Sequence, residues 1–411
     1  MARSRIDVTL LFATRILRLF AYGLLSVVLV LYLAQIGLSE EAIGVLLSLT
    51  LIGDAGISLW ITTAADRIGR KRMLLLGAAL MILAGAAFVM TDNLAVLMLA
   101  AIIGVISPSG NEIGPFLSIE QAALSQLLPD GRRTRAFAWY NLAGSFATAS
   151  GALVGGWMAH TLQASGYTEL ESYRAVLIGY AICGTVLAAA FLCLSSAIET
   201  VARPLPARQT MGLHRSRKVV LRLSALFALD AFAGGFVVQS LIAYWFHIRF
   251  GIDAGMLGGI FFAANILAGV SALLASRIAA RIGLIRTMVF THIPSNVLLC
   301  LVPFMPSLPL ATGVLLLRFS ISQMDVPTRQ SYTMAVVAPD ERSAASGVTT
   351  VARSVGAAVS PALSGLLLAN PLLFGAPFVI AGGLKIVYDL LLYQNFLSLK
   401  PPEEKSDSPS F

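Results

Sequence analysis

Long uninterrupted apolar runs are the feature that most constrains how this chain folds. Stretches such as residues 19–37, 73–90 and 255–275 are each long enough to cross about 30 Å of hydrocarbon as an α-helix. Charged residues make up only 12% of the 411 residues, against about 25% in a typical soluble protein. Because the apolar runs show no alternation with a period of two, a membrane β-barrel is not indicated. The sequence predicts an all-α membrane protein.

The apolar runs divide into twelve candidate transmembrane helices. No small-residue cleavage site separates the first helix from the second, so we expect the first to be retained rather than removed as a signal peptide. The predicted spans are residues 8–36, 42–65, 73–91, 94–128, 136–161, 174–197, 219–246, 255–280, 285–304, 308–338, 344–369 and 374–397.

Basic residues collect in every second connection between these spans. The connections on the other side hold little more than Arg174 and Arg249. The positive-inside rule therefore places both termini in the cytoplasm. The same asymmetry accounts for the net charge of +8, so no nucleic-acid partner is needed, although basic loops attract anionic membrane lipid.

A polar, basic linker divides the predicted spans into two sets of six. It covers residues 198–218, and we expect it to be cytoplasmic. The predicted domains are an N-terminal six-helix bundle over residues 1–197, a C-terminal six-helix bundle over residues 219–397, and a disordered cytoplasmic tail over residues 398–411.

The two halves carry matching residues in their loops. A shift of 214 residues places Arg67-Ile68-Gly69, after the second span, on Arg281-Ile282-Gly283, after the eighth. A gapless shift of 210 residues aligns a second group of loop residues, Pro129, Asp130 and Arg132, with Pro339, Asp340 and Arg342. Such matches predict two pseudo-symmetric bundles with the same orientation.

The loop between the second and third spans resembles the signature loop of the major facilitator superfamily. Residues 65–72 read Ala-Asp-Arg-Ile-Gly-Arg-Lys-Arg, and Thr62 stands where the family motif usually begins with glycine. The resemblance extends to the span number, the linker, the orientation and the repeat. It implies that family's fold and a secondary transporter. It also implies a conformational gate that fastens the two halves on the cytoplasmic side, formed by Asp66, Arg67, Gly69 and Arg70.

The end of the fifth span resembles the end of the family's antiporter motif. Residues 150–156 read Ser-Gly-Ala-Leu-Val-Gly-Gly, with Ala152 in place of the motif's proline. Gly151, Gly155 and Gly156 fit close helix packing equally well, because glycine lets helix backbones approach each other in lipid. The motif leaves antiport and simple packing as alternatives.

Ionisable residues inside the spans carry most of the functional information. Each costs at least about 2.5 kcal/mol at the bilayer centre on insertion scales, so each needs a partner, water or a function. Spans one, four, seven and ten, which line the central cavity in the resembled family, carry the candidates for contact with substrate: Arg18, Tyr22, Asn111, Glu112, Glu120, Asp230, Arg318, Asp325 and Arg329. The spacing of Arg318, Ser322, Asp325 and Arg329 predicts one polar helix face, on which Asp325 and Arg329 can neutralise each other.

Two deep carboxylates are candidate proton carriers. Glu112 lies in span four, which Pro108 and Pro115 are expected to kink, and Asp230 lies at a comparable depth in span seven. A desolvated carboxylic acid can be relieved by protonation. The alternative is that Arg18 or Arg318 holds each acid ionised.

Asp54 in span two and Arg353 in span eleven lie at matching depths. They are 12 residues from Asp66 and 11 residues from Arg342, or about 18 and 16 Å of helix. In the resembled family these two spans adjoin across the halves, so we predict a salt bridge between Asp54 and Arg353 that takes part in the conformational gate.

The sequence shows no catalytic, nucleotide-binding or metal-binding motif, so we expect no enzyme activity, no cofactor and no metal. The first functional hypothesis is a monomeric transporter that exports small organic or amphiphilic compounds in exchange for protons, with a bacterial inner membrane as its location. Proton-coupled uptake or exchange of an organic anion is the alternative, because guanidinium groups bind carboxylates bidentately. A non-transporting membrane sensor is the alternative of another class.

Overall fold

The computed structural model describes residues 2–110, 116–199, 214–338, 341–397 and 399. For a few residues within helices it describes only the backbone, namely residues 2–5, 66, 130–132, 134–135 and 343. The described residues form α-helices and two short 3-10 turns and contain no β-strand, which confirms the all-α prediction. Asn111 and Glu112 lie outside the described residues.

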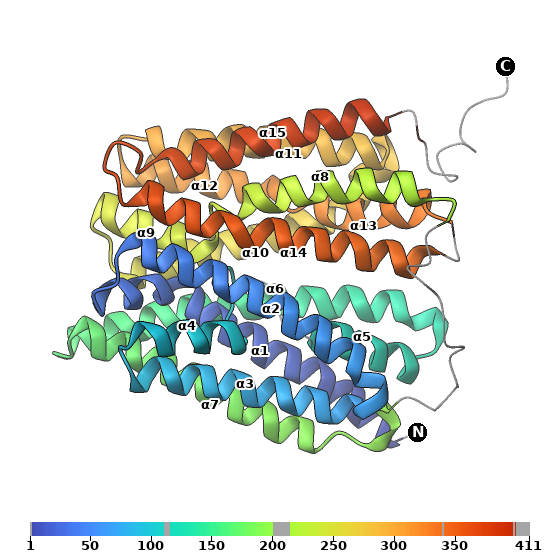
Figure 1. Ribbon diagram of the computed structural model, residues 1–411, viewed down its shortest axis with the longest axis horizontal. Coiled ribbons are helices and arrows are strands. Elements are labelled where there is room, and N and C mark those ends of the chain that lie inside the picture. The colour runs from blue at the N-terminus through green and yellow to red at the C-terminus, as the bar shows by residue number, and fades with distance from the viewer. Residues whose placement is uncertain (1, 111–115, 200–213, 339–340, 398, 400–411) are drawn as a thin grey trace. The chain divides into compact units, whose positions relative to one another are not determined.

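The described part of the chain contains fifteen α-helices (Figure 1). They are α1 (Ala2–Gln35), α2 (Glu40–Ile68), α3 (Arg70–Met90), α4 (Leu94–Ile103), α5 (Phe116–Leu127), α6 (Asp130–Ala164), α7 (Glu169–Leu192), α8 (Arg217–Gly235), α9 (Gln239–Phe250), α10 (Ala254–Ile282), α11 (Leu284–Leu301), α12 (Leu308–Ser322), α13 (Asp325–Val336), α14 (Arg342–Leu368) and α15 (Ala376–Phe396). Among the described residues, nine helical segments are long and apolar enough to cross a membrane. The pairs α4–α5, α8–α9 and α12–α13 each occupy one predicted span, so the helices correspond to the twelve spans.

Spans seven and ten are broken helices, which the sequence analysis did not predict. In span seven, α8 ends at Gly235, and the free carbonyl of Phe236 accepts a hydrogen bond of 2.9 Å from the Ser364 hydroxyl. Span ten breaks after Ser322, and α13 starts at Asp325. The ring of Pro327 excludes a helical carbonyl four residues earlier, so the single polar face predicted for span ten is divided between two helices.

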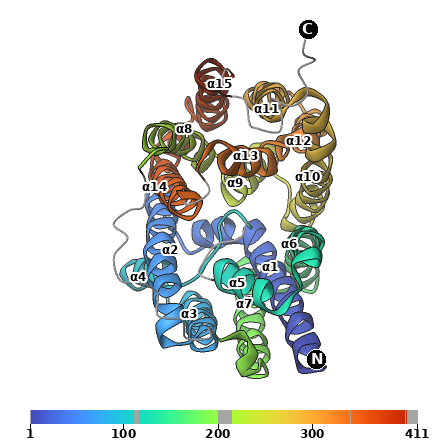
Figure 2. The same cartoon turned by 90° about the vertical axis from the view of Figure 1, so that its right-hand side faces the viewer.

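Contacts divide the chain into two compact units. Unit 1 comprises residues 1–203 and 238–266, and unit 2 comprises residues 204–237 and 267–411. Within unit 1, α1 packs against α6, α7 and α9, and α3 packs against α7. Within unit 2, α8 lies between α14 and α15 (Figure 2), and α15 also packs against α11. Residues 238–266 group with unit 1, although they follow the predicted linker, because α9 packs against α1 and Ala254 and Gly258 of α10 lie against Gly156 of α6.

Three predicted packing glycines lie in α6 where it meets neighbouring helices of unit 1. A Cβ atom on Gly151 would collide with the backbone carbonyl of Phe20 in α1, and one on Gly155 would lie 2.7 Å from that of Leu24. A Cβ atom on Gly156 would collide with the carbonyl of Ala254 at the start of α10. Close packing of the helix backbones therefore explains why glycine occupies all three positions, and this explanation does not require a role in antiport.

The repeated Arg-Ile-Gly loops adopt similar turns. Gly69, between α2 and α3, has a φ of +115°, and Gly283, between α10 and α11, has a φ of +86°. Residues with a Cβ atom rarely adopt positive φ, so both turns require glycine. In unit 1 the Glu199 carboxylate accepts hydrogen bonds from the backbone N–H groups of Arg70 (2.7 Å) and Lys71 (3.2 Å), which caps the start of α3.

In unit 2 the Glu341 carboxylate caps the start of α8. It accepts hydrogen bonds from the backbone N–H groups of His214, Arg215 (2.7 Å) and Ser216 (2.8 Å). Burial by itself raises the pKa of Glu341, but these hydrogen bonds and one from the Ser216 hydroxyl outweigh it and lower the pKa to about 2.

Because the pKa of Glu341 is lowered in the folded state, its contribution to stability is present above its unfolded pKa of about 4.3 and lost as the pH falls toward 2. We expect Glu341→Gln to lower the melting temperature at pH 7 and to flatten its pH dependence between about pH 5 and pH 3. Thermal unfolding in detergent, followed by intrinsic fluorescence, measures both effects. A variant with the wild-type pH dependence would contradict this role of Glu341.

Candidate functional site

A buried carboxylate in unit 2 binds cations from three different helices. Asp230, on α8, is 4% exposed. Its Oδ1 lies 2.5 Å from Nζ of Lys385 on α15, and its Oδ2 lies 3.1 Å from Nη1 of Arg329 on α13 and 3.2 Å from Nη1 of Arg353 on α14. Asp230 therefore ties α8 to the three helices α13, α14 and α15.

A second carboxylate completes this group. Asp325 Oδ2 lies 3.0 Å from Arg329 Nη1, in the i, i+4 pair that the sequence spacing predicts. We call Asp230, Asp325, Arg329, Arg353 and Lys385 the Asp230 cluster. It sets three cations against two carboxylates. The Arg353 side chain is 35% exposed, so the cluster presents one cation to its surroundings.

Arg318, on α12, adds a further cation to unit 2. Its guanidinium lies 4.9 Å from the ring centroid of Phe319, and its buried Nε has no hydrogen-bond partner in the described structure. No carboxylate among the described residues forms an ion pair with it. An arginine with a buried, unused Nε donor is suited to an anionic ligand.

A buried histidine–carboxylate pair lies elsewhere in unit 2. His292 Nδ1, on α11, lies 2.9 Å from Asp389 Oδ1, on α15, and Nδ2 of Asn296 donates a hydrogen bond of 3.0 Å to Asp389 Oδ2. His292 is 5% exposed, and neither of the other two side chains is exposed to solvent. The sequence analysis did not predict this group.

Unit 1 contains a fully buried ion pair. Arg18 on α1 donates two hydrogen bonds to Glu120 on α5, from Nη1 to Oε1 at 2.9 Å and from Nη2 to Oε2 at 2.8 Å. The Glu120 carboxylate also accepts from the hydroxyls of Thr14 (2.9 Å) and Tyr140. Both charges of the pair are satisfied inside the protein, so Arg18 and Glu120 fit a structural pair better than a substrate contact. Tyr22, the other candidate on α1, is completely buried.

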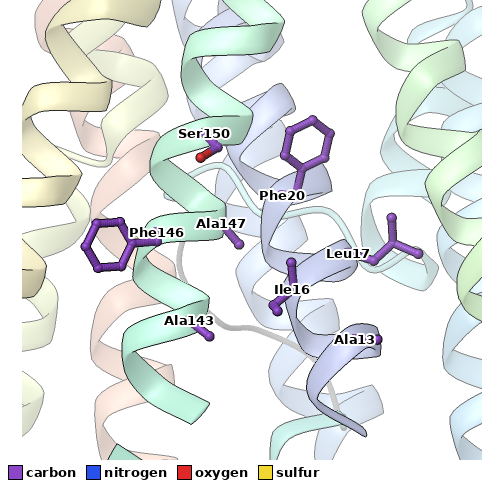
Figure 3. A pocket seen from close by; sticks show the side chains of 8 residues that line it. All are labelled: Ala13, Ile16, Leu17, Phe20, Ala143, Phe146, Ala147 and Ser150. Atoms are coloured by element: carbon purple, nitrogen blue, oxygen red, sulfur yellow. The ribbon is translucent and has the colours of Figure 1, made fainter. Parts of the chain in front are cut away.

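Figure 3 shows a pocket between α1 and α6 of unit 1. Its volume is about 560 Å³, and it opens at the protein surface, where the lining side chains of Ile16 and Phe146 are 43% and 45% exposed. Seven of the eight labelled side chains are alanine, isoleucine, leucine or phenylalanine, and Ser150 is the polar exception. The pocket is suited to apolar groups and offers no charge.

Two of the residues predicted to form the gate, Arg70 and Asp54, make hydrogen bonds within unit 1. Arg70 Nη1 donates to Gln126 Oε1 at 3.0 Å and to the carbonyl of Ile198 at 3.1 Å. Arg67 is exposed, and the structure does not describe the side chain of Asp66. Asp54 accepts a hydrogen bond of 3.2 Å from Ser58. The gate and the salt bridge between Asp54 and Arg353 remain predictions.

The sequence analysis missed two charged residues of unit 2, Lys385 and Asp389. Both lie inside the predicted last span, where a charge is costly, and their spacing of four residues places them on one helix face. This signal was present in the sequence. The last span lies outside the set of spans that lines the central cavity in the resembled family.

The sequence of this chain matches a known family of proteins and a membrane protein of yeast. A family model described as Major Facilitator Superfamily matches residues 11–361. An uncharacterised membrane protein of Saccharomyces cerevisiae (YJR124C) is 32% identical over 424 residues, which cover 96% of this chain and 94% of the yeast protein.

Solved transporter structures share the fold at low identity. The nucleoside transporter NupG superposes with a TM-score of 0.72 at 15% identity, covering 95% of this chain and 98% of NupG. A D-xylose–proton symporter gives 0.71 at 14%, covering 94% and 97% of the two chains. The human organic anion transporter MFSD10 (TETRAN) gives 0.60 at 17%, covering 95% and 99%. The chain therefore belongs to the Major Facilitator Superfamily, and it is a multi-pass membrane transporter rather than an enzyme.

Proposed function

We propose that this protein is a secondary active transporter of a small organic anion, which it moves by alternating access of its two halves. The observation that carries the proposal is the charge balance of the Asp230 cluster, with three cations against two carboxylates. A buried surplus charge is costly, and an anionic ligand relieves that cost. The partly exposed Arg353 and the donors of Arg318 are the groups that would bind its carboxylate or phosphate.

The same geometry argues against Asp230 as the proton carrier. Protonation of Asp230 would leave Lys385, Arg329 and Arg353 around a neutral group, at a high cost in repulsion and lost hydrogen bonds. The alternative in which cations hold Asp230 ionised is better supported, although Arg329, Arg353 and Lys385 take the place of the expected Arg18 or Arg318. Glu112 remains a candidate proton carrier.

Proton-coupled efflux of amphiphilic compounds is the second candidate function. The pocket between α1 and α6 favours this second function, because an apolar pocket of about 560 Å³ suits the hydrophobic part of an uncharged ligand (Figure 3). The fold is compatible with both candidates, since similar structures belong to a transporter of nucleosides, a xylose–proton symporter and an organic anion transporter.

Uptake into proteoliposomes tests the anion proposal. The probes are radiolabelled benzoate, succinate and glucose 6-phosphate, with glucose and tetraphenylphosphonium as neutral and cationic comparisons. We expect uptake of at least one anion, and Arg353→Gln should reduce it by about ten- to a hundredfold, the value of one charged hydrogen bond of about 1.5–3 kcal/mol.

Arg222→Gln is the matched control for Arg353→Gln. Arg222 lies on α8 and is exposed, so the variant removes the same charge from unit 2 without touching the Asp230 cluster. We expect its uptake to stay within about twofold of wild type. Uptake of the cation alone would favour the efflux candidate, and specific anion binding without flux would favour the sensor alternative. Equal loss in both variants would contradict the assignment of Arg353.

We further propose that both termini lie in the cytoplasm, on the basis of the basic loops, and that the protein acts as the monomer that the sequence analysis expects. The yeast relative comes from a eukaryote, so a bacterial inner membrane has no support from the comparisons. Accessibility of single cysteines placed in the basic and the opposite loops tests the orientation.

A further inference from the structure

We propose that the buried pair of His292 and Asp389 is a proton-binding site linked through Lys385 to the Asp230 cluster, so that a proton and the substrate anion bind together. This inference rests on the proposed transport of an anion. It assigns the proton to α11 and α15, away from the deep acids in spans four and seven that the sequence analysis selected.

The pair has the geometry of a single-proton site. Both oxygens of Asp389 already accept hydrogen bonds, at 2.9 Å from His292 Nδ1 and at 3.0 Å from Asn296 Nδ2. Nδ1 must therefore carry hydrogen when Asp389 is ionised, which leaves Nε2 of His292 to gain or lose the proton. Histidine is the side chain whose unperturbed pKa, about 6.5, lies closest to neutral pH.

Asn296 offers an unused hydrogen-bond acceptor beside the pair. Oδ1 of Asn296 is buried and has no hydrogen-bond partner among the described residues. Buried polar atoms of this kind usually bind an ordered water. A water bound to Asn296 would carry the proton to and from the pair through surroundings that are mostly apolar.

Apolar side chains around the pair strengthen its electrostatic interaction with neighbouring charges. The His292 ring meets the Tyr388 ring edge to face, with centroids 6.1 Å apart. Tyr388 belongs to a buried cluster contributed by α8, α11, α13 and α15, which contains Leu223, Phe227, Ile285, Met288, Val289, Tyr332, Tyr388, Leu392 and Phe396. Charges are poorly screened in such apolar surroundings, because the effective dielectric constant is lower than in water. A change of one charge therefore acts over a longer distance than it does at the surface.

Lys385 connects the pair to the Asp230 cluster. It lies one helical turn before Asp389 on α15, and its Nζ is 2.5 Å from Asp230 Oδ1. When His292 is neutral, the negative charge of Asp389 competes with Asp230 for the lysine. When His292 is protonated, it neutralises Asp389, and Lys385 stays with Asp230.

Protonation of His292 also changes the net charge of the groups to which an anion would bind. The charged and titratable groups that interact with the pair are Asp230 on α8 and Lys385 and Tyr388 on α15. With His292 neutral, Asp389 cancels the surplus cation of the Asp230 cluster. With His292 protonated, the surplus is restored. A bound anion therefore raises the affinity for the proton, and a bound proton raises the affinity for the anion by the same factor. This coupling is the basis of symport.

Proton uptake on anion binding tests this inference. Calorimetric titration of the purified protein with benzoate, succinate and glucose 6-phosphate, in buffers of different ionisation enthalpy, gives the number of protons taken up per anion. We expect wild type to take up a proton together with the anion, and His292→Gln to take up none. In vesicles, this variant should lose accumulation driven by a pH gradient, and its remaining anion exchange should no longer depend on pH.

His160→Gln is the matched control. His160 Nδ1 also lies 2.9 Å from a carboxylate oxygen, Asp253 Oδ2, but the two side chains are 51% and 46% exposed and belong to unit 1. We expect this variant to behave as wild type. If His292→Gln does not fold, Asp389→Asn provides a second variant that keeps the size of the side chain and is also expected to abolish proton uptake.

The outcomes separate this inference from the proposed function. Absence of anion flux in wild type contradicts the proposed anion transport itself. Anion flux with full proton uptake and pH-driven accumulation in His292→Gln or Asp389→Asn contradicts only the proton site. NMR titration of a protein that retains His292 as its one histidine is independent of transport. Titration of His292 unchanged by a bound anion would also overturn the inference.

Discussion

Asp230→Asn is expected to abolish anion transport and to lower the free energy of unfolding by about 3–5 kcal/mol, the usual cost of removing one partner from a buried ion pair. The variant keeps the size of the side chain but removes the charge that Lys385, Arg329 and Arg353 share. The three cations then face one another across α8 with Asp325 as the remaining carboxylate of the cluster. Denaturant titration in detergent measures the stability, and proteoliposome uptake measures the transport.

A compensating change distinguishes charge repulsion from loss of packing. The double variant Asp230→Asn with Lys385→Met removes one cation together with the carboxylate and restores the original surplus of one positive charge. We expect it to regain at least half of the lost stability without regaining coupled transport. An Asp230→Asn protein within about 1 kcal/mol of wild type would show that Asp230 does not hold the cluster together.

Arg18→Met is expected to have the second-largest effect, a loss of about 3–5 kcal/mol of unfolding free energy. The substitution leaves the Glu120 carboxylate, which is completely buried, with only the hydroxyls of Thr14 and Tyr140 as partners. The double variant Arg18→Met with Glu120→Met replaces both charges by apolar groups and should recover most of the loss. The same denaturant titration measures all of these variants.

An exposed pair of similar geometry serves as the control for Arg18. Arg174 Nη2 lies 2.7 Å from Asp92 Oδ1, with side chains that are 31% and 54% exposed. Arg174→Met should cost less than about 1 kcal/mol, because water solvates the charge that remains. A loss in Arg18→Met no greater than that in Arg174→Met would contradict the account of the buried pair.

The sequence predicted the fold well, because the properties that define it are local. Apolar run length gives the spans, and loop residues such as Arg67-Ile68-Gly69 and Arg281-Ile282-Gly283 reveal the repeat. The pairing of Asp325 with Arg329 also follows from helix periodicity alone, since both lie on one helix. Pro327 marks the break in span ten in the local sequence, and this signal was missed. The break in span seven was missed because the carbonyl that it frees has a distant partner. Phe236 finds its partner in Ser364, more than a hundred residues away.

The candidate site was less predictable, because its partners come from different helices. The sequence shows that Arg18, Glu120 and Asp230 are deep and charged, but not that Arg18 faces Glu120 or that Asp230 faces Lys385. Periodicity identifies the face of one helix and leaves open which neighbour that face meets. The contact of His292 with Asp389 likewise depends on the packing of α11 against α15, which periodicity does not give.

The internal pH of proteoliposomes, followed with a trapped dye while single compounds are added outside, tests the central claim most directly. The account predicts that organic anions acidify the vesicle interior as protons enter with them, that cationic and neutral compounds do not, and that Asp230→Asn abolishes the signal. Alkalinisation of the interior driven by cationic compounds, with no response to any anion, would contradict it and would favour proton-coupled efflux.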